Sequence, residues 1–328
     1  MESSDVLYQK IADEFNLGKI SFIETIQILW SGYGKLVRLK FSNKSIIVKH
    51  VKLPKKSSHP RGWNTDLSHK RKLHSYEVEV NWYRKFSKNI DNNCRIPQGL
   101  KCIQHENEWL IVMEDLANIG FTSTPSYAYK THLESSLSWL ANFHAKYMNV
   151  KTDIIWEIGT YWHLDTRPDE FKLLEDKELK SFAKPIDIIL NTTKFQTIVH
   201  GDAKLANFCF NSDGTSCAAV DFQYVGHGCG MKDISYFMSS TIEPELSEKM
   251  EEWILDTYFD ALEVALKNYQ PDIDILDVEE EWRPLFCVAW ADFQRFLKGW
   301  SPNHFKINEY SEELTSKALA YLKSKESY

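Results

Sequence analysis

Two acidic loops, each following a short apolar run, constrain this chain more than any other feature. Residues 197–199 are apolar and lead into Asp202, within His-Gly-Asp, and residues 217–220 lead into Asp221. Asn207 lies between the two loops. Short apolar runs bounded by turn formers predict buried strands. We therefore expect a strand–loop–strand unit that presents two carboxylates and one amide.

This set of groups is the one that phosphoryl transfer requires. One carboxylate orients the attacking hydroxyl and accepts its proton, and an Asn with a second Asp holds Mg²⁺ on the triphosphate. In chain order, Asp202 is the candidate base, and Asn207 and Asp221 are the candidate metal ligands. Three loop residues at the surface would be the plain alternative, which the upstream half of the chain argues against.

The string VHGDAKLANFCF…AAVDFQYVGHGCGMKDISYF resembles the catalytic segment of the aminoglycoside phosphotransferase and choline kinase superfamily, most closely its ecdysteroid kinase-like branch. Eukaryotic protein kinases have His-Arg-Asp in place of His-Gly-Asp. The resemblance implies a two-lobed, protein-kinase-like α+β fold and ATP-dependent phosphorylation of a hydroxyl on a small organic acceptor. It also implies that Lys204 steadies the γ-phosphate, as a loop lysine does in Ser/Thr protein kinases.

The N-terminal part is expected to be an antiparallel sheet. Strands are predicted at residues 26–30, 36–41 and 45–51. The turn after the first strand contains Gly32, Tyr33 and Gly34. Glycines allow backbone amides to approach phosphates closely, and they also serve ordinary hairpin turns. We expect this turn to cover the nucleotide phosphates.

Lys49 and Glu79 are expected to form an ion pair that positions the nucleotide. Lys49 shares a strand face with Ile47 and Val51, where a lysine is costly unless it meets an anion. The resemblance implies that it binds the α- and β-phosphates. A helix is predicted at residues 75–88, with Ser75 as its N-cap. Glu79 falls within its apolar stripe and Glu77 at the margin, so Glu79 is the predicted partner.

A second pair of strands, 99–103 and 109–113, precedes the segment Met113, Glu114, Asp115 and Leu116. This segment resembles the kinase hinge, where backbone groups bind adenine. Met113, Glu114 and Leu116 are therefore candidate nucleotide-binding residues.

Residues 54–74 form a basic insert rich in turn formers. A cationic lid over the triphosphate is one interpretation, using Arg61, His69, Lys70 and Arg71. A solvated loop fits the composition equally well.

Helices dominate the expected C-terminal lobe. One face carries His144, which we interpret as a hydrogen-bonded core histidine. Further helices are predicted at 246–267, 280–300 and 311–323. The second of these has a tryptophan-rich stripe that includes Trp290. Such a stripe is more typical of a core than of a cation-binding aromatic box. Trp290, Asp292 and Arg295 are candidates for lining the substrate cleft.

Length and composition fit this picture. The chain has 328 residues, and we expect lobes at 1–116 and 117–328 with ATP between them. A net charge of −7 argues against nucleic acid as a partner and favours a cationic or neutral acceptor. Neither a membrane span nor a secretory signal is predicted, and the six cysteines show no CxxC spacing, so a cytoplasmic location is expected.

Two features separate the chain from protein kinases. Gln223 follows Asp221-Phe222 where those enzymes have glycine. The stretch from Asp221 to Asp233 is short for a peptide-docking segment, and Asp233 is the predicted N-cap of a helix. Two alternatives remain: a nucleotide-binding regulator without turnover, and a protein kinase.

Overall fold

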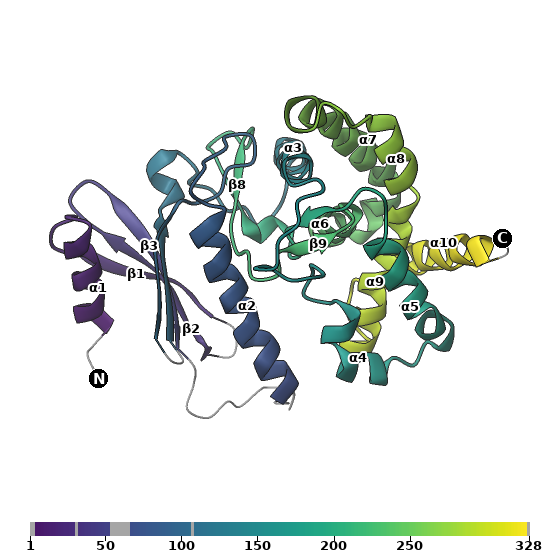
Figure 1. The fold of residues 1–328 in the computed structure, drawn as a ribbon, viewed down its shortest axis with the longest axis horizontal. Coiled ribbons are helices and arrows are strands. Elements are labelled where there is room, and N and C mark those ends of the chain that lie inside the picture. Colours follow the sequence, from purple (N-terminus) through teal and green to yellow (C-terminus); the bar gives the residue numbers. More distant parts are fainter. Residues whose placement is uncertain (1–3, 30–31, 53–65, 106–107, 327–328) are drawn as a thin grey trace. The chain divides into compact units, whose positions relative to one another are not determined.

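The computed structural model describes residues 4–29, 32–52, 66–105 and 108–326. The chain divides into two compact units, one of residues 1–90 with 96–122 and one of residues 91–95 with 123–328. The first unit contains a sheet with helices, and the second is largely helical (Figure 1). This arrangement confirms the predicted α+β class. The lobe boundary expected at residue 116 stays a prediction.

The sheet of the first unit is antiparallel, with strand order β1-β2-β3-β5-β4. Its strands are β1 (Phe22–Ile28), β2 (Gly34–Lys40), β3 (Ser45–Lys52), β4 (Gly99–His105) and β5 (Glu108–Glu114). All five were predicted, but β1 begins four residues before the expected start at residue 26 and ends before residue 30. Most of β1 is an exposed sheet edge, so no apolar alternation marks its bounds.

The two faces of this sheet are covered by different helices (Figure 1). Helix α1 (Ser4–Glu14) packs Tyr8 and Ile11 against a core that includes Val48. Because side chains alternate along a strand, Lys49 points to the opposite face, toward helix α2 (Asp66–Lys85). This alternation explains how a lysine occupies the middle of a buried strand.

Helix α2 is longer than the sequence predicted. It begins at Asp66, so the N-cap role expected of Ser75 was wrong. The Ser75 hydroxyl lies inside the helix and donates to the Lys72 carbonyl at 2.8 Å. Leu, Lys and Arg between residues 67 and 73 are good helix formers, which the basic composition obscured. The second half of the insert is therefore helical. Its first half, with Arg61, lies outside the described residues.

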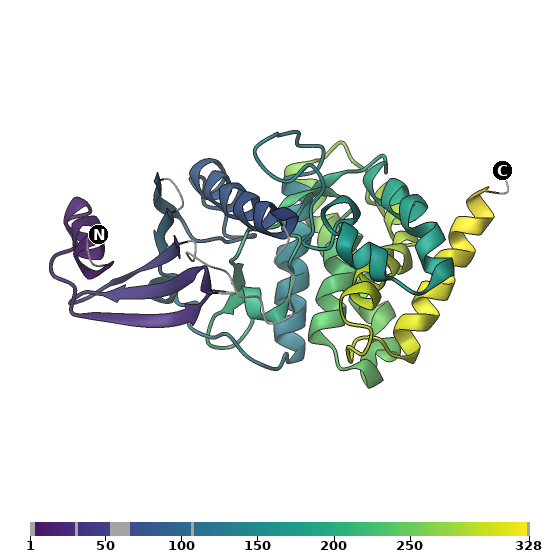
Figure 2. The same cartoon turned by 90° about the horizontal axis from the view of Figure 1, so that it is seen from below.

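The second unit is built from helices and two short β-ribbons. Helices α3 and α7 pack along each other, as do α9 and α10. Helix α10 carries the C-terminal end of the described chain (Figure 2). Within the described ranges, no helix is long and apolar enough to cross a membrane. The helices are α3 (Lys130–Lys146), α4 (Pro168–Leu173), α5 (Lys177–Asn191), α6 (Met231–Thr241), α7 (Pro244–Tyr269), α8 (Ile275–Trp282), α9 (Leu285–Trp300) and α10 (Glu309–Glu326).

The helix predicted at 280–300 is in fact two. Helix α8 ends at Trp282, and α9 begins at Leu285 with Pro284 as its N-cap. Proline lacks the backbone N–H needed inside a helix and clashes with the preceding turn. The prediction of a single helix was wrong because it followed the spacing of the aromatic residues and did not take Pro284 into account.

The two ribbons carry the acidic loops. Strand β6 (Thr197–Val199) pairs with β9 (Gly226–Gly228), and β7 (Phe208–Phe210) pairs with β8 (Cys217–Ala219). All four strands are antiparallel to their partners. The strand–loop–strand unit expected from the sequence is therefore present.

Candidate active site

The loop after β6 places the Asp202 carboxylate among polar groups. Its Oδ2 accepts hydrogen bonds from Lys204 Nζ at 3.0 Å and Asn207 Nδ2 at 3.1 Å. Asp202 is only 6% exposed, and within the described residues its Oδ1 has no hydrogen-bond partner. A buried acceptor without a hydrogen bond costs desolvation free energy. This oxygen is therefore able to accept a hydrogen bond from a bound ligand.

Lys204 remains positively charged in this setting. Burial acts to lower the pKa of its ammonium, but the charge and hydrogen bond of Asp202 outweigh that effect and raise it. The two side chains thus form an ion pair through Asp202 Oδ2, and Oδ1 of the same carboxylate takes no part in it.

Asp233 supports the loop that carries Asp202. Its Oδ2 accepts the His200 backbone N–H at 2.5 Å, and its Oδ1 accepts that of Gly201 at 2.9 Å. Helix α6 starts at Met231, so the N-cap role predicted for Asp233 was wrong. The carboxylate turns from its own helix to the loop because the loop amides are buried and need acceptors.

His144 completes this support. Its Nε2 lies 3.1 Å from Asp233 Oδ2, and its Nδ1 lies 2.8 Å from the Tyr258 hydroxyl. His144 is fully buried. It is the hydrogen-bonded core histidine that the sequence suggested, and it acts on the loop through Asp233.

Two residues of the loops adopt left-handed backbone conformations. Asp221 has φ 69°, and Gly201 has φ 78°. A Cβ on Gly201 would lie 2.1 Å from the Tyr224 carbonyl oxygen, so only glycine fits there. Left-handed aspartates are uncommon and are often found at functional sites. The Asp221 carboxylate accepts from Gln223 Nε2 at 2.7 Å, which gives Gln223 an orienting role.

Asn207 and Asp221 have donor atoms that suit Mg²⁺. The Asn207 amide nitrogen donates to Asp202, so its oxygen is the amide atom left for a cation. Among the described residues, no group of three or more His, Cys, Asp or Glu side chains gathers around one point. Mg²⁺ does not need such a group, since it is bound by one or two carboxylates together with phosphates and water. The donor set fits the ion, and the assignment stays a prediction.

In the first unit, the structure brings Lys49 and Glu79 together. Lys49 Nζ lies 2.8 Å from Glu79 Oε1 and 2.7 Å from Oε2. The two residues are 5% and 1% exposed. Glu77 is exposed and lies 3.4 Å from His74 Nδ1 instead. The helix phase predicted from the apolar stripe is therefore the phase observed.

The glycine turn of this unit is tightly built. Gly34 has φ 135°, and a Cβ there would lie 2.0 Å from the His50 carbonyl oxygen. Gly32 has φ 73° and open space around it. The buried Tyr33 hydroxyl lies 3.0 Å from His69 Nδ1 on α2. Part of the basic insert thus contacts the turn, while the phosphate-binding role of both stays a prediction.

The hinge-like segment begins inside the sheet. Met113 is buried in β5, and the Glu114 backbone N–H donates to the Gln98 carbonyl at 2.9 Å. Leu116 opens a short 3-10 helix, Leu116–Ile119, capped by Asp115. Adenine binding by Met113, Glu114 and Leu116 stays a prediction.

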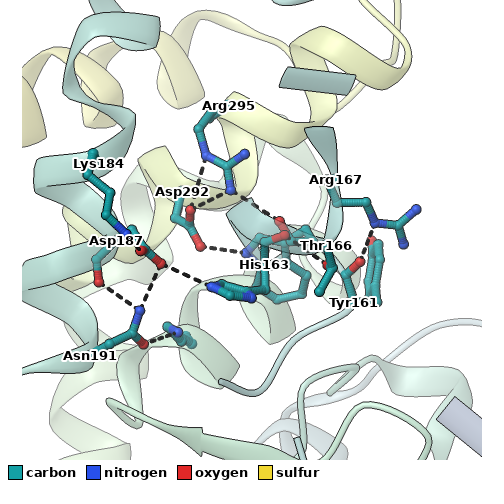
Figure 3. A network of polar contacts seen from close by, with 11 residues as sticks. Tyr161, His163, Thr166, Arg167, Lys184, Asp187, Asn191, Asp292 and Arg295 are labelled. Atoms are coloured by element: carbon teal, nitrogen blue, oxygen red, sulfur yellow. Dashed lines mark hydrogen bonds and ion pairs between the residues drawn. The ribbon is translucent and has the colours of Figure 1, made fainter. Parts of the chain in front are cut away.

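The residues expected to line the substrate cleft are buried. Trp290, Asp292 and Arg295 are 4%, 4% and 0% exposed. Arg295 Nη2 donates to Asp292 Oδ1 at 2.8 Å and to the Trp162 carbonyl at 3.1 Å (Figure 3). Asp292 Oδ2 accepts from Trp162 Nε1 at 3.0 Å. These contacts brace the segment that contains Trp162, and direct contact with an acceptor stays a prediction.

A group that the sequence did not indicate lies beside Asp202. The Tyr161 backbone N–H donates to the Gly201 carbonyl at 3.3 Å, and the Tyr161 hydroxyl donates to that of Tyr236 at 3.3 Å. Burial and the charge of Asp202 raise the pKa of both tyrosines. Lys306 Nζ lies 5.1 Å from the Tyr236 ring centroid. No local pattern marks these residues, because the chain brings them together from three distant segments.

Comparison with known protein families supports the resemblance predicted for the region of the two acidic loops. The sequence model of the ecdysteroid kinase-like family matches residues 157–270, which include both acidic loops. The predicted resemblance is confirmed over this region. No curated protein matches the chain in sequence.

Solved structures with low sequence identity share the fold. An amicoumacin kinase bound to AMP-PNP and Ca²⁺ is 13% identical, with 99% of this chain and 96% of that chain covered and a TM-score of 0.51. A microcompartment-associated aminopropanol kinase is 12% identical, with 98% of each chain covered and a TM-score of 0.53. An ethanolamine kinase of Plasmodium vivax is 14% identical, with 98% of this chain and 89% of that chain covered and a TM-score of 0.50. The predicted kinase-like fold is confirmed.

Proposed function

We propose that this protein is an ATP-dependent small-molecule kinase that phosphorylates a hydroxyl group of an organic acceptor. The observation that carries the proposal is the Asp202 carboxylate, held by Lys204 and Asn207 on Oδ2 while the buried Oδ1 has no close hydrogen-bond partner among the described residues. An acceptor hydroxyl is a donor of the right kind. A carboxylate in this position orients the nucleophile and takes its proton.

The reaction exchanges one phosphorus–oxygen bond for another. The acceptor oxygen bonds to the γ-phosphorus, the bond from that phosphorus to the bridging oxygen of ADP breaks, and ADP leaves. The hydroxyl proton passes to Asp202 and then to solvent. Lys204 Nζ, 3.0 Å from Asp202, steadies negative charge on the transferring phosphoryl group.

The remaining predicted residues bind the nucleotide. In the proposal Lys49, positioned by Glu79, binds the α- and β-phosphates, and the Gly32–Gly34 turn supplies backbone amides. Adenine binds along Met113, Glu114 and Leu116. Asn207 and Asp221 would hold Mg²⁺, which neutralises phosphate charge when bound. The AMP-PNP and Ca²⁺ in the amicoumacin kinase structure support a nucleotide with a divalent cation.

Several observations favour a small acceptor over a protein. Strand β9 pairs with β6 directly after the Asp221 loop, and α6 begins at Met231, which leaves little chain for peptide docking. The aminopropanol and ethanolamine kinases that share the fold are named for small alcohols. The chain would act on a compound of that size.

The test is an ATP-consumption screen of the full chain with Mg²⁺ against a pooled library of hydroxyl compounds. Wild type should form a phosphorylated product. Asp202→Asn should bind ATP normally but transfer phosphate about 10²–10⁴-fold more slowly. Asp213→Asn is the matched control, because Asp213 lies in an exposed turn and accepts hydrogen bonds from Thr215 of the same turn.

A nucleotide-binding regulator would give a different result. It would bind Mg·ATP without forming product from any compound in the library. Near-wild-type transfer by Asp202→Asn would show instead that another group is the base. Phosphorylation of generic protein substrates alone would favour the protein kinase alternative.

A further inference from the structure

Four side chains of the second unit gather beside Asp202, and we call them the acceptor wall: Tyr161, Tyr236, Phe293 and Lys306. Lys306 Nζ lies 5.1 Å from the Tyr236 ring centroid and 5.5 Å from that of Phe293. The Tyr161 and Tyr236 rings meet edge to face, with their centroids 5.5 Å apart. Tyr236 and Phe293 are buried and form the back of the wall, while half-buried Tyr161 and Lys306 form its accessible part.

The ammonium of Lys306 lacks a close anion. Over the described residues, Nζ makes no hydrogen bond and no ion pair within 4.0 Å, although it lies over two aromatic rings. The charge that stabilises the ammonium is that of Asp202, whose Oδ2 already pairs with Lys204. Aromatic faces compensate a cation only in part. A half-buried lysine in this state gains most from a ligand that brings a negative charge.

Polar contacts fix the segment that carries Tyr161 (Figure 3). Arg167 Nε donates to the Tyr161 carbonyl at 2.6 Å, and its Nη1 pairs with Glu170 at 3.1 Å. The buried Arg295–Asp292 pair binds both the indole and the carbonyl of Trp162, the next residue. Tyr161 is thus fixed on either side before any ligand binds. A segment fixed in this way loses little conformational freedom when a ligand binds to it.

We infer that the acceptor wall binds a hydroxylated compound that carries an aromatic or other flat apolar body and a negatively charged group. The body lies against Tyr161, the anion pairs with Lys306, and the hydroxyl is presented to Asp202 Oδ1. Organic cations are disfavoured, because they would place like charge beside Lys306. This inference rests on the proposed function. It reverses the preference expected from the net charge, since local charge governs a site of this size.

The test measures binding with three probes that share a benzyl alcohol and carry an anionic, a neutral or a cationic para substituent of similar size. They are para-(hydroxymethyl)benzoate, para-methylbenzyl alcohol and para-(aminomethyl)benzyl alcohol. Each is titrated against the full chain at pH 7 by ligand-observed NMR, without nucleotide. The anion should bind on the order of tenfold more tightly than the cation, with the neutral probe between them.

Variants at Lys306 isolate the cause. Lys306→Met keeps an apolar stem of similar length and should abolish the preference for the anion, whereas Lys306→Arg should retain it. Lys249→Met is the matched control on the exposed face of α7 and should behave as wild type. Equal binding of anion and cation, no binding of the anion at millimolar concentration, or a preference that survives in Lys306→Met would each overturn the inference.

The same variants separate this inference from the proposed kinase activity. Failure to transfer phosphate to any compound, together with Lys306-dependent anion binding, would reject the function and keep the site. Active phosphotransfer with anion-independent binding would reject the site and keep the function. If Lys306→Met weakened ATP binding and left the probe preference unchanged, Lys306 would be a nucleotide ligand and the inference would fail.

Discussion

Lys49 Nζ lies within 2.8 Å of both carboxylate oxygens of Glu79, and both residues are nearly withdrawn from solvent. A buried ion pair is weak evidence for stability by itself, because desolvation offsets its attraction. Breaking it by removing one partner is a different matter, since a buried charge is left behind. The pair is therefore a sensitive place to test whether the first unit binds the nucleotide as proposed.

Glu79→Gln should lower turnover at saturating acceptor by roughly tenfold or more, which corresponds to about 1.4 kcal/mol in the barrier. The neutral amide no longer holds the Lys49 ammonium in place. It should also destabilise the fold by about 3–5 kcal/mol in chemical denaturation. Glu77→Gln is the control, because Glu77 is exposed on the same helix. A larger loss of turnover in Glu77→Gln than in Glu79→Gln would show that Glu79 is not the functional partner of Lys49.

Asp221→Ala should weaken the affinity for Mg·ATP far more than the affinity for metal-free ATP. The carboxylate is assigned to the metal, not to the nucleotide itself. Isothermal titration calorimetry with and without Mg²⁺ measures both values. Gln223→Ala removes the hydrogen bond that orients this carboxylate and should show a smaller effect of the same sign. Equal losses in both titrations would contradict the metal assignment.

Asp233→Asn should reduce both stability and turnover, although Asp233 touches no substrate in the proposal. Its carboxylate accepts the His200 and Gly201 amides and faces His144. The amide group offers one acceptor oxygen in place of two, so a buried N–H loses its partner at a cost of about 1–3 kcal/mol. Denaturant unfolding measures the first effect and kcat the second. If the KM for ATP also rose strongly, Asp233 would affect nucleotide binding as well, and support of the loop alone would not explain its role.

The affinity for an anionic acceptor should fall as the pH rises through about 8. Burial lowers the pKa of Lys306 to about 8, against the opposing effect of Asp202, so the ammonium is charged below this pH and neutral above it. The other groups that face it change little there. The pKa of Lys204 is raised, which keeps it charged, and those of Tyr161 and Tyr236 are raised, which keeps them neutral.

Titration of para-(hydroxymethyl)benzoate binding from pH 6 to pH 10 checks this dependence, with para-methylbenzyl alcohol as the neutral reference. Lys306→Arg should flatten the profile, because a guanidinium stays protonated over the whole range. A profile for the anion that matches the neutral probe would show that Lys306 does not contact the charged group.

Much of the fold was predictable because its signals are local. Alternating side chains in the strand of Lys49 and the apolar stripe of α2 placed Lys49 and Glu79 on facing surfaces, and the structure has them in contact. Apolar runs before Asp202 and Asp221 likewise marked β6 and β8. In each case a short periodic pattern determines which face of an element is buried.

Other features had no local signal. The role of Asp233 depends on loop amides more than thirty residues away in the chain, with separations of 33 to His200 and 32 to Gly201. The acceptor wall joins the segment of Tyr161, helices α6 and α9, and the loop before α10. Neither arrangement follows from periodicity.

The sequence by itself determined which chemical groups leave the strand ends and which face Lys49 occupies, because backbone geometry alternates over a few residues. Only the tertiary structure decided that Asp233 supports the loop that carries Asp202 and that Lys306 lies over Tyr236. The physical reason is that burial and charge compensation depend on all neighbours in space. Those neighbours come from distant segments, and no spacing along the chain encodes their meeting.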